Sequence, residues 1–287
     1  MPAIGTSALV GLALLALAPG ADPSRAEDKT QVPQAAPRDA ASQPEAMEPV
    51  LPVPPVPPRV ASGTDYESCL AMLSDDPQGA ESFAETWAAK GGGDGAAHCH
   101  ALAQIALGSP DAGAALLDTL AGDSAAPPAA RAMIYGQAEE AWMMASAPAR
   151  ALDSATHALA LKPDDADLLI ARAGAAMAMG GYADAIEDLN RALEIDPRRA
   201  DALVLRGSAW RSAGRLDLAT ADIDHAIDID PDDPEALLER GILRQRRGDR
   251  SGARADWQRA IDLDPDSDAA ALAQQDLALL EAGPDRR

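Results

Sequence analysis

Positive charge is scarce in this chain. It has 24 lysines and arginines against 46 aspartates and glutamates, which gives a formal net charge of −22 at pH 7. Nucleic acids and anionic lipid headgroups are bound through basic surfaces that attract phosphate groups. We therefore expect neither nucleic acid as a partner nor direct binding of lipid.

The chain also lacks the local motifs of common enzymes. It contains no glycine-rich phosphate-binding loop and no nucleophile motif. The histidines show no spacing to partner residues; they are His98, His100, His157 and His225. The sequence therefore predicts a protein that is not an enzyme and needs no cofactor or metal. A catalytic or metal-binding protein, with a site that only folding assembles, is the less favoured alternative.

Cysteine is limited to Cys69 and Cys99. In an oxidising compartment an even number of cysteines favours a disulfide, and closing a loop of about 30 residues contributes about 3.5 kcal/mol to stability. The alternative is a metal site formed by the run from His98 to His100. Consecutive helical residues point about 100° apart, so these three side chains cannot converge on one ion. The sequence favours the disulfide.

The N-terminus predicts export from a bacterial cell. Residues 1–20 contain no acidic residue, and an apolar stretch from Ala8 to Ala18 is broken by Pro19 and Gly20. This stretch is too short to span a bilayer comfortably and is typical of a secretory signal peptide. We predict a signal peptide within residues 1–26, cleaved after Gly20 or Ala26, and a periplasmic or secreted protein. An uncleaved N-terminal anchor is the alternative.

A proline-rich segment follows. Residues 22–60 contain ten prolines and few large apolar side chains. Such a segment cannot bury enough apolar surface to offset the entropy lost on ordering, and its prolines favour an extended, stiff chain. We predict a disordered linker over residues 27–62 that acts as a spacer. A ligand for a proline-binding domain is a less favoured interpretation.

The second half of the chain repeats every 34 residues. This period appears in prolines and alanines: Pro163, Pro197, Pro231 and Pro265, and Ala158, Ala192, Ala226 and Ala260. In the copy over residues 166–199, apolar and small residues recur at steps of three and four up to Gly180. A second amphipathic run starts at Tyr182 and stops before Pro197, which cannot continue a helix. Each copy therefore predicts two helices joined by a turn.

The residue pattern of each copy resembles the tetratricopeptide repeat. Its characteristic bulky, small and proline positions are filled in the best copy by Leu203, Gly207, Trp210, Ala219, Ile223, Ala226 and Pro231. The resemblance covers Ala132 to Pro265 and divides into repeats at 132–165, 166–199, 200–233 and 234–267. In the first copy, Glu139 replaces the small residue and Ser146 the turn glycine, so its helices are expected to cross less closely. The chain looks like an exported bacterial member of this family.

The resemblance implies an all-α fold, a right-handed superhelical solenoid of antiparallel helix pairs. Solenoids need atypical ends, and the segments beside the repeats fit that need. Residues 63–131 are expected to form an irregular helical extension with a degenerate repeat. Its four helices are predicted near 65–73, 78–90, 95–107 and 110–121. A single capping helix is expected over residues 268–283.

The last three repeats share an arginine at their seventh position and an aspartate sixteen residues later. The pairs are Arg172 and Asp188, Arg206 and Asp222, and Arg240 and Asp256. The first repeat lacks both and has Ala138 and Ser154 instead. Because the two residues are lost together, we interpret them as structural ion pairs between the helices of each hairpin. A row of ligand-binding arginines is the less favoured interpretation.

In tetratricopeptide folds the first helices of the repeats line a concave surface. Carried onto this sequence, the resemblance implies a lining of Met133, Gln137, Glu140, Met143, Met144, Ile170, Met177, Val204, Leu205, Arg211, Leu238, Ile242 and Arg246. The groove-facing positions of the pattern also include the acidic residues Asp167, Asp201, Glu235 and Glu239. Aliphatic and methionine side chains suit an extended or helical peptide. The methionines have an alternative interpretation as ordinary packing residues of an irregular first repeat.

We therefore hypothesise a non-enzymatic scaffold of the cell envelope that binds a protein partner through this groove. A structural envelope component without a dedicated peptide ligand is the alternative. The family members that grip a terminal carboxylate use lysine and asparagine at these positions. Here the same positions are largely acidic or aliphatic, which argues against that kind of clamp.

Overall fold

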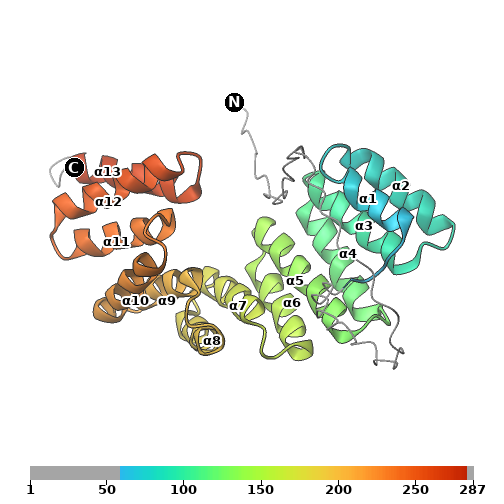
Figure 1. Cartoon of the computed structure of the whole chain (residues 1–287), viewed down its shortest axis with the longest axis horizontal. Coiled ribbons are helices and arrows are strands. Elements are labelled where there is room, and N and C mark those ends of the chain that lie inside the picture. Colours follow the sequence, from blue (N-terminus) through green and yellow to red (C-terminus); the bar gives the residue numbers. More distant parts are fainter. Residues whose placement is uncertain (1–58, 283–287) are drawn as a thin grey trace, which may run out of the picture. The chain divides into compact units, whose positions relative to one another are not determined.

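The computed structural model describes residues 59–282, and in that range the chain forms thirteen helices and no strand (Figure 1). The helices are α1 (Thr64–Met72), α2 (Pro77–Ala89), α3 (Gly93–Ala106), α4 (Pro110–Asp123), α5 (Pro128–Met144), α6 (Pro148–Leu161), α7 (Ala166–Ala178), α8 (Tyr182–Ile195), α9 (Ala200–Ser212), α10 (Leu216–Ile229), α11 (Pro234–Arg246), α12 (Arg250–Leu263) and α13 (Asp268–Ala282). None of these helices is both long enough and apolar enough to cross a membrane. The predicted signal peptide and most of the predicted linker lie outside the described residues.

The helices stack as consecutive antiparallel pairs, and each one packs against the next along the chain (Figure 1). The first helices of neighbouring repeats also contact one another, α5 with α7, α7 with α9 and α9 with α11. Within residues 59–282, the second helices α6, α8, α10 and α12 make no comparable contact among themselves. The first helices therefore form the inner layer of the stack, and the predicted all-α solenoid of helix pairs is confirmed over this range.

Short sequence signals set where the helices begin. The side chain of Asp165 accepts hydrogen bonds from the backbone N–H groups of Asp167 and Leu168 and caps the start of α7. Asp233 caps α11 in the same way. These bonds satisfy N–H groups that have no partner within the helix. Part of the acidity at the repeat junctions is thus explained by helix capping.

The turn inside each hairpin needs a left-handed residue. Gly180, Gly214 and Gly248 fill this position with φ angles of 78°, 75° and 86°. Glycine takes this conformation without the steric penalty that a side chain brings. In the first repeat Ser146 takes it instead, with φ of 55°. The turn therefore keeps its shape although the glycine is missing.

The crossing of the two helices in a hairpin depends on matched sizes at two facing positions. A Cβ atom on Gly207 would lie 2.7 Å from Cδ1 of Ile223, and one on Gly241 would lie 2.3 Å from Nε1 of Trp257. The large side chain of the second helix thus occupies the space left by glycine on the first. Any larger residue at these glycines would force the helices apart.

The first repeat reverses this arrangement. Glu139 stands where later repeats have a small residue, and the facing position holds Ala155, where later repeats have Leu189, Ile223 and Trp257. Both residues are buried at this crossing, Glu139 at 7% and Ala155 at 0% exposed. The small alanine compensates for the large glutamate.

An arginine and an aspartate join the two helices in each of the last three repeats. The Nε and Nη2 atoms of Arg206 donate to both carboxylate oxygens of Asp222, at 2.8 and 2.7 Å. The same two-bond geometry links Arg172 to Asp188, at 2.7 and 2.6 Å, and Arg240 to Asp256, at 3.0 and 2.8 Å. The three aspartates are buried, so each needs its arginine.

In the first repeat a residue from outside the repeat replaces this pair. Asp118 of α4 accepts hydrogen bonds from Ser154 Oγ at 2.7 Å and from Trp142 Nε1 at 2.8 Å. Ser154 occupies the position of the missing aspartate. The N-terminal extension therefore supplies the polar contact that the first hairpin cannot make alone.

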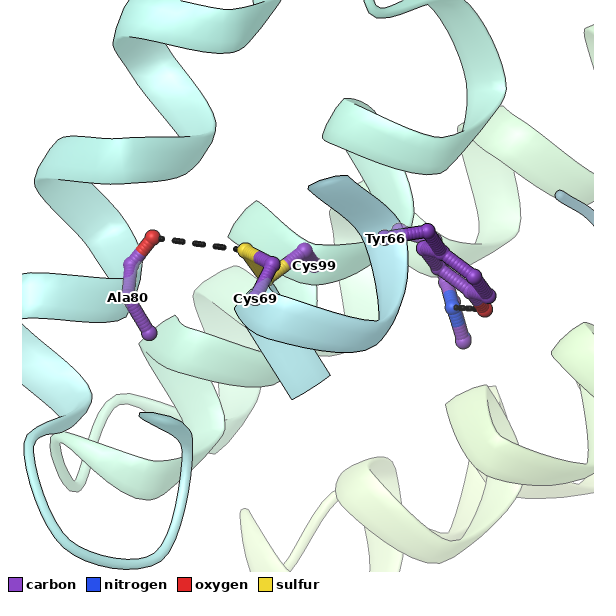
Figure 2. Close-up of a disulfide and its surroundings, with 5 residues drawn as sticks. Tyr66, Cys69, Ala80 and Cys99 are labelled. Atoms are coloured by element: carbon purple, nitrogen blue, oxygen red, sulfur yellow. Dashed lines mark hydrogen bonds between the residues drawn. A yellow bond between two sulfur atoms is a disulfide. The ribbon is translucent and has the colours of Figure 1, made fainter. Parts of the chain in front are cut away.

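A disulfide fastens α1 to α3. Cys69 and Cys99 are joined with their Cα atoms 6.2 Å apart, and Sγ of Cys69 lies 3.6 Å from the carbonyl oxygen of Ala80 on α2 (Figure 2). Both cysteines are fully buried. The bridge closes a loop with a sequence separation of 30, across the part of the chain that lacks the regular repeat.

The Arg206→Ala variant should lower the free energy of unfolding by about 1 to 3 kcal/mol, because it leaves the buried Asp222 carboxylate unpaired. Chemical denaturation followed by circular dichroism measures this change. Arg198→Ala, which removes an exposed arginine at a repeat junction, serves as the control and should leave the midpoint unchanged. The double variant Arg206→Ala, Asp222→Ala should lose less free energy of unfolding than the sum of the losses in the two single variants. An unchanged midpoint combined with lost peptide binding would make Arg206 a ligand residue instead.

Candidate peptide-binding face

The residues predicted to line a groove come from the first helices α5, α7, α9 and α11, which form the inner layer. Two of them do not reach the surface. Val204 is 4% exposed and Leu238 is 6% exposed. Val204 packs in a core cluster with residues of α11, and Leu238 packs in one with residues of α13. The prediction that these two line the groove is therefore wrong, because α11 packs over Val204 and the capping helix α13 packs over Leu238.

The other apolar residues of the predicted lining remain accessible to different degrees. Met144, at the end of α5, is 54% exposed. The remaining six are partly buried at the rim of the core clusters: Met133, Met143, Ile170, Met177, Leu205 and Ile242. These seven residues extend over all four first helices, and we call them the apolar strip.

Two polar residues of the predicted lining are engaged within the protein. Arg211 of α9 donates from Nε and Nη2 to Glu239 of α11, at 2.7 and 2.9 Å. This bond raises the pKa of the Arg211 guanidinium above its ordinary value. Gln137 of α5 is bonded to His98. Both side chains hold neighbouring helices together, whereas Glu140 and Arg246 are exposed.

Gln137 ends a buried polar chain that runs from α1 through α3 to α5. The Tyr66 hydroxyl lies 2.6 Å from Nδ1 of His98, and Nε2 of His98 lies 2.7 Å from Oε1 of Gln137. Burial lowers the pKa of His98, which favours the neutral ring. The hydrogen-bond partners of the neutral ring then determine which nitrogen carries the proton. The Tyr66 hydroxyl donates to Nδ1 of His98, and the Nε2–H group of His98 donates to the amide oxygen of Gln137.

An acidic row borders the apolar strip at the start of the first helices. The second position of three successive repeats is acidic, at Asp167, Asp201 and Glu235. Arg199 bridges Asp167 and Asp201, at 2.5 and 2.7 Å. Glu235 is exposed, but partial desolvation raises its pKa, and nearby carboxylates including Asp233 and Asp201 raise it further. The family pattern places these three residues at groove-facing positions, and their 34-residue spacing is visible in the sequence.

The first repeat also buries a carboxylate between its helices. Glu139 is 7% exposed, and burial together with the neighbouring Glu140 raises its pKa to about 7. A protonated carboxyl group is much less costly to bury than a carboxylate. The replacement of the usual small residue thus leaves a group that titrates near neutral pH.

The comparisons with known proteins agree with this architecture. Residues 170–234 match the family model described as tetratricopeptide repeat. A thermophilic tetratricopeptide repeat protein of Thermus thermophilus is 19% identical, with a TM-score of 0.52 over 64% of this chain and 99% of that one. A chain of the Cut9–Hcn1 assembly of the APC/C is 15% identical, with a TM-score of 0.55 over 74% of this chain and 42% of that one.

A further solved structure, YrrB, is described as a tetratricopeptide repeat protein with an unusual peptide-binding site. It is 22% identical, with a TM-score of 0.46 over 63% of this chain and 91% of that one. The comparison with curated proteins finds no match. Residues 170–234 thus carry tetratricopeptide repeats, and the two structures with the higher TM-scores have the same fold.

Glu139→Gln should stabilise the protein at pH 8. Below about pH 4.5 this group is protonated in both the folded and the unfolded chain, whereas between pH 4.5 and 7 only the folded chain keeps the proton. Stability should therefore fall as the pH rises through this window. Removing the charge should therefore raise the free energy of unfolding at pH 8 by up to about 3 kcal/mol.

Denaturation midpoints from pH 4 to pH 8 test this expectation. The variant should show a flatter pH profile than the wild type, whereas Glu140→Gln on the exposed neighbour should change it only slightly. A glutamine variant that is less stable than the wild type at pH 8 would contradict the assignment, because it would mean that the protein stabilises the charged form.

Proposed function

We propose that this protein is a non-enzymatic scaffold of the bacterial cell envelope that holds a peptide segment of a partner protein against its first helices. The apolar strip is the observation that carries the proposal. Tetratricopeptide repeat solenoids use the surface formed by their first helices for extended contacts with other proteins. The partly exposed methionines and aliphatic residues of α5, α7 and α9 offer apolar contacts in the same place.

The chemistry of the face describes the ligand. Methionine side chains are flexible and polarisable, so they adapt to apolar side chains of different shapes. An amphipathic helix or an extended segment can place its apolar side chains along such a strip. The acidic row and the net charge of −22 favour a ligand with lysine or arginine beside its apolar residues.

Two further features support the proposed export. Residues 1–26 have the composition of a secretory signal peptide. The disulfide between Cys69 and Cys99 is of a kind that persists in oxidising compartments and is rare in the cytosol. The proline-rich segment then acts as a spacer between the N-terminus and the folded repeats.

The triple variant Met144→Glu, Met177→Glu, Leu205→Glu tests the peptide-binding face. Peptides are first selected from a random display library on the immobilised wild type, and their affinities are then measured by fluorescence anisotropy. The selected peptides should combine apolar with basic residues, and the triple variant should weaken their binding at least about tenfold, which equals a loss of about 1.4 kcal/mol.

A matched control adds the same charges to the second helices. Ile195, Leu218 and Leu263 are exposed apolar residues of α8, α10 and α12. Their change to glutamate should leave affinity within about twofold of the wild type. Equal loss in both triple variants, with circular dichroism spectra that show folded protein, would rule out the first helices as the binding face.

Export and the disulfide can be tested in one measurement. The full chain is expressed in a Gram-negative bacterium, and the mature protein from the periplasm or medium is analysed by intact mass spectrometry. Its mass should correspond to cleavage after Gly20 or Ala26, and alkylation should modify the cysteines only after reduction. Full-length protein in the membrane fraction would instead support the uncleaved anchor, and alkylation without reduction would argue against the disulfide.

A further inference from the structure

Three side chains that can ligate a metal converge between α2 and α3. Glu81 and Glu85 lie one turn apart on α2, and His100 lies on α3. One carboxylate oxygen of each glutamate and one ring nitrogen of His100 all lie within 4.8 Å of one another. Among the described residues, this is the one group of histidine, cysteine and acidic side chains with such geometry.

A fourth polar side chain already bridges these groups. Gln104 lies one turn after His100, and its Nε2 atom donates to Oε1 of Glu81 and lies 3.5 Å from Nε2 of His100. The amide NH₂ group thus occupies a position between two electron-rich atoms, where a cation would also be attracted. Rotating the amide by a half turn would bring its oxygen to this place instead.

The fold explains why these residues meet. Residues four apart on a helix share one face, so α2 presents Glu81 with Glu85 and α3 presents His100 with Gln104. The two helices are packed against each other as a hairpin. Glu81 and His100 are partly buried and Glu85 is exposed, so the group lies at the surface and is open to an ion from solution.

We propose that Glu81, Glu85 and His100 form a binding site for a divalent transition metal ion, with Zn²⁺ as the ion of choice. Zinc accepts mixed carboxylate and imidazole ligands at about 2.0 to 2.2 Å, usually four in number. Mg²⁺ and Ca²⁺ prefer oxygen ligands alone. Small side-chain rotations bring the three ligand atoms within bonding distance of one ion. The Gln104 oxygen or a water molecule supplies the fourth ligand.

The site was not visible in the sequence because its ligands come from two helices and follow no metal-binding motif. The run from His98 to His100 does point in three directions in the structure. His98 contacts Tyr66 and Gln137, Cys99 forms the disulfide, and His100 faces α2. An ion at this site would tie α2 to α3, just as the disulfide ties α1 to α3.

Isothermal titration of the oxidised, metal-free protein with ZnCl₂ tests the proposal. The wild type should bind one ion per chain at this site, and bound zinc should raise its thermal midpoint. His100→Asn and the double variant Glu81→Gln, Glu85→Gln should each lower the affinity at least about tenfold, because even the loss of an outer partner of a metal ligand costs about 10- to 100-fold. Neither variant should show the zinc-dependent rise in midpoint.

Two matched controls separate this site from the general acidity of the chain. His225→Asn removes an exposed histidine of α10, and the double variant Asp184→Asn, Glu187→Gln removes two exposed carboxylates of α8. Both should bind zinc like the wild type. The proposal is overturned if the wild type binds no zinc, or if His100→Asn and the Glu81, Glu85 double variant bind it as well as the controls do.

Discussion

The close crossing of the two helices in each hairpin is the constraint on which the rest of the structure depends. In the last three repeats it is set by paired sizes, such as Gly241 against Trp257, and fixed by a two-bond contact between a partly buried arginine and a buried aspartate. Since each hairpin packs on the next, this crossing determines how closely the first helices approach one another. The spacing of the apolar strip follows from that approach.

The helices and their pairing were predictable because they depend on local patterns that recur. Four aligned copies reveal which positions must be small, large or proline, and these positions determine a hairpin on their own. Even in the irregular extension, the predicted ranges 65–73 and 78–90 differ by about one residue from α1 and α2. The linkage of each repeat arginine to the aspartate of its own copy follows from the same comparison.

The surface was less predictable, because exposure depends on residues of neighbouring repeats. Val204 and Leu238 occupy positions that the family pattern assigns to the lining, but α11 covers the first and the capping helix α13 covers the second. The bond between Arg211 and Glu239 joins two repeats and exists in no other copy, so no internal comparison could reveal it. The large Glu139 faces the small Ala155. This exchange of sizes appears in the sequence only when the two facing positions are compared together.

The contact of Asp118 with Ser154 and Trp142 has a consequence for how such an array can grow. The last three repeats each contain their own polar contact, so a duplicated copy placed among them would arrive with its partners. In the first repeat, by contrast, the acceptor of this contact is Asp118 of α4, which lies outside the repeat. A copy inserted ahead of the first repeat would separate Ser154 and Trp142 from Asp118. Gene duplication could therefore lengthen this solenoid more readily in its C-terminal half than at the junction between α4 and the first repeat.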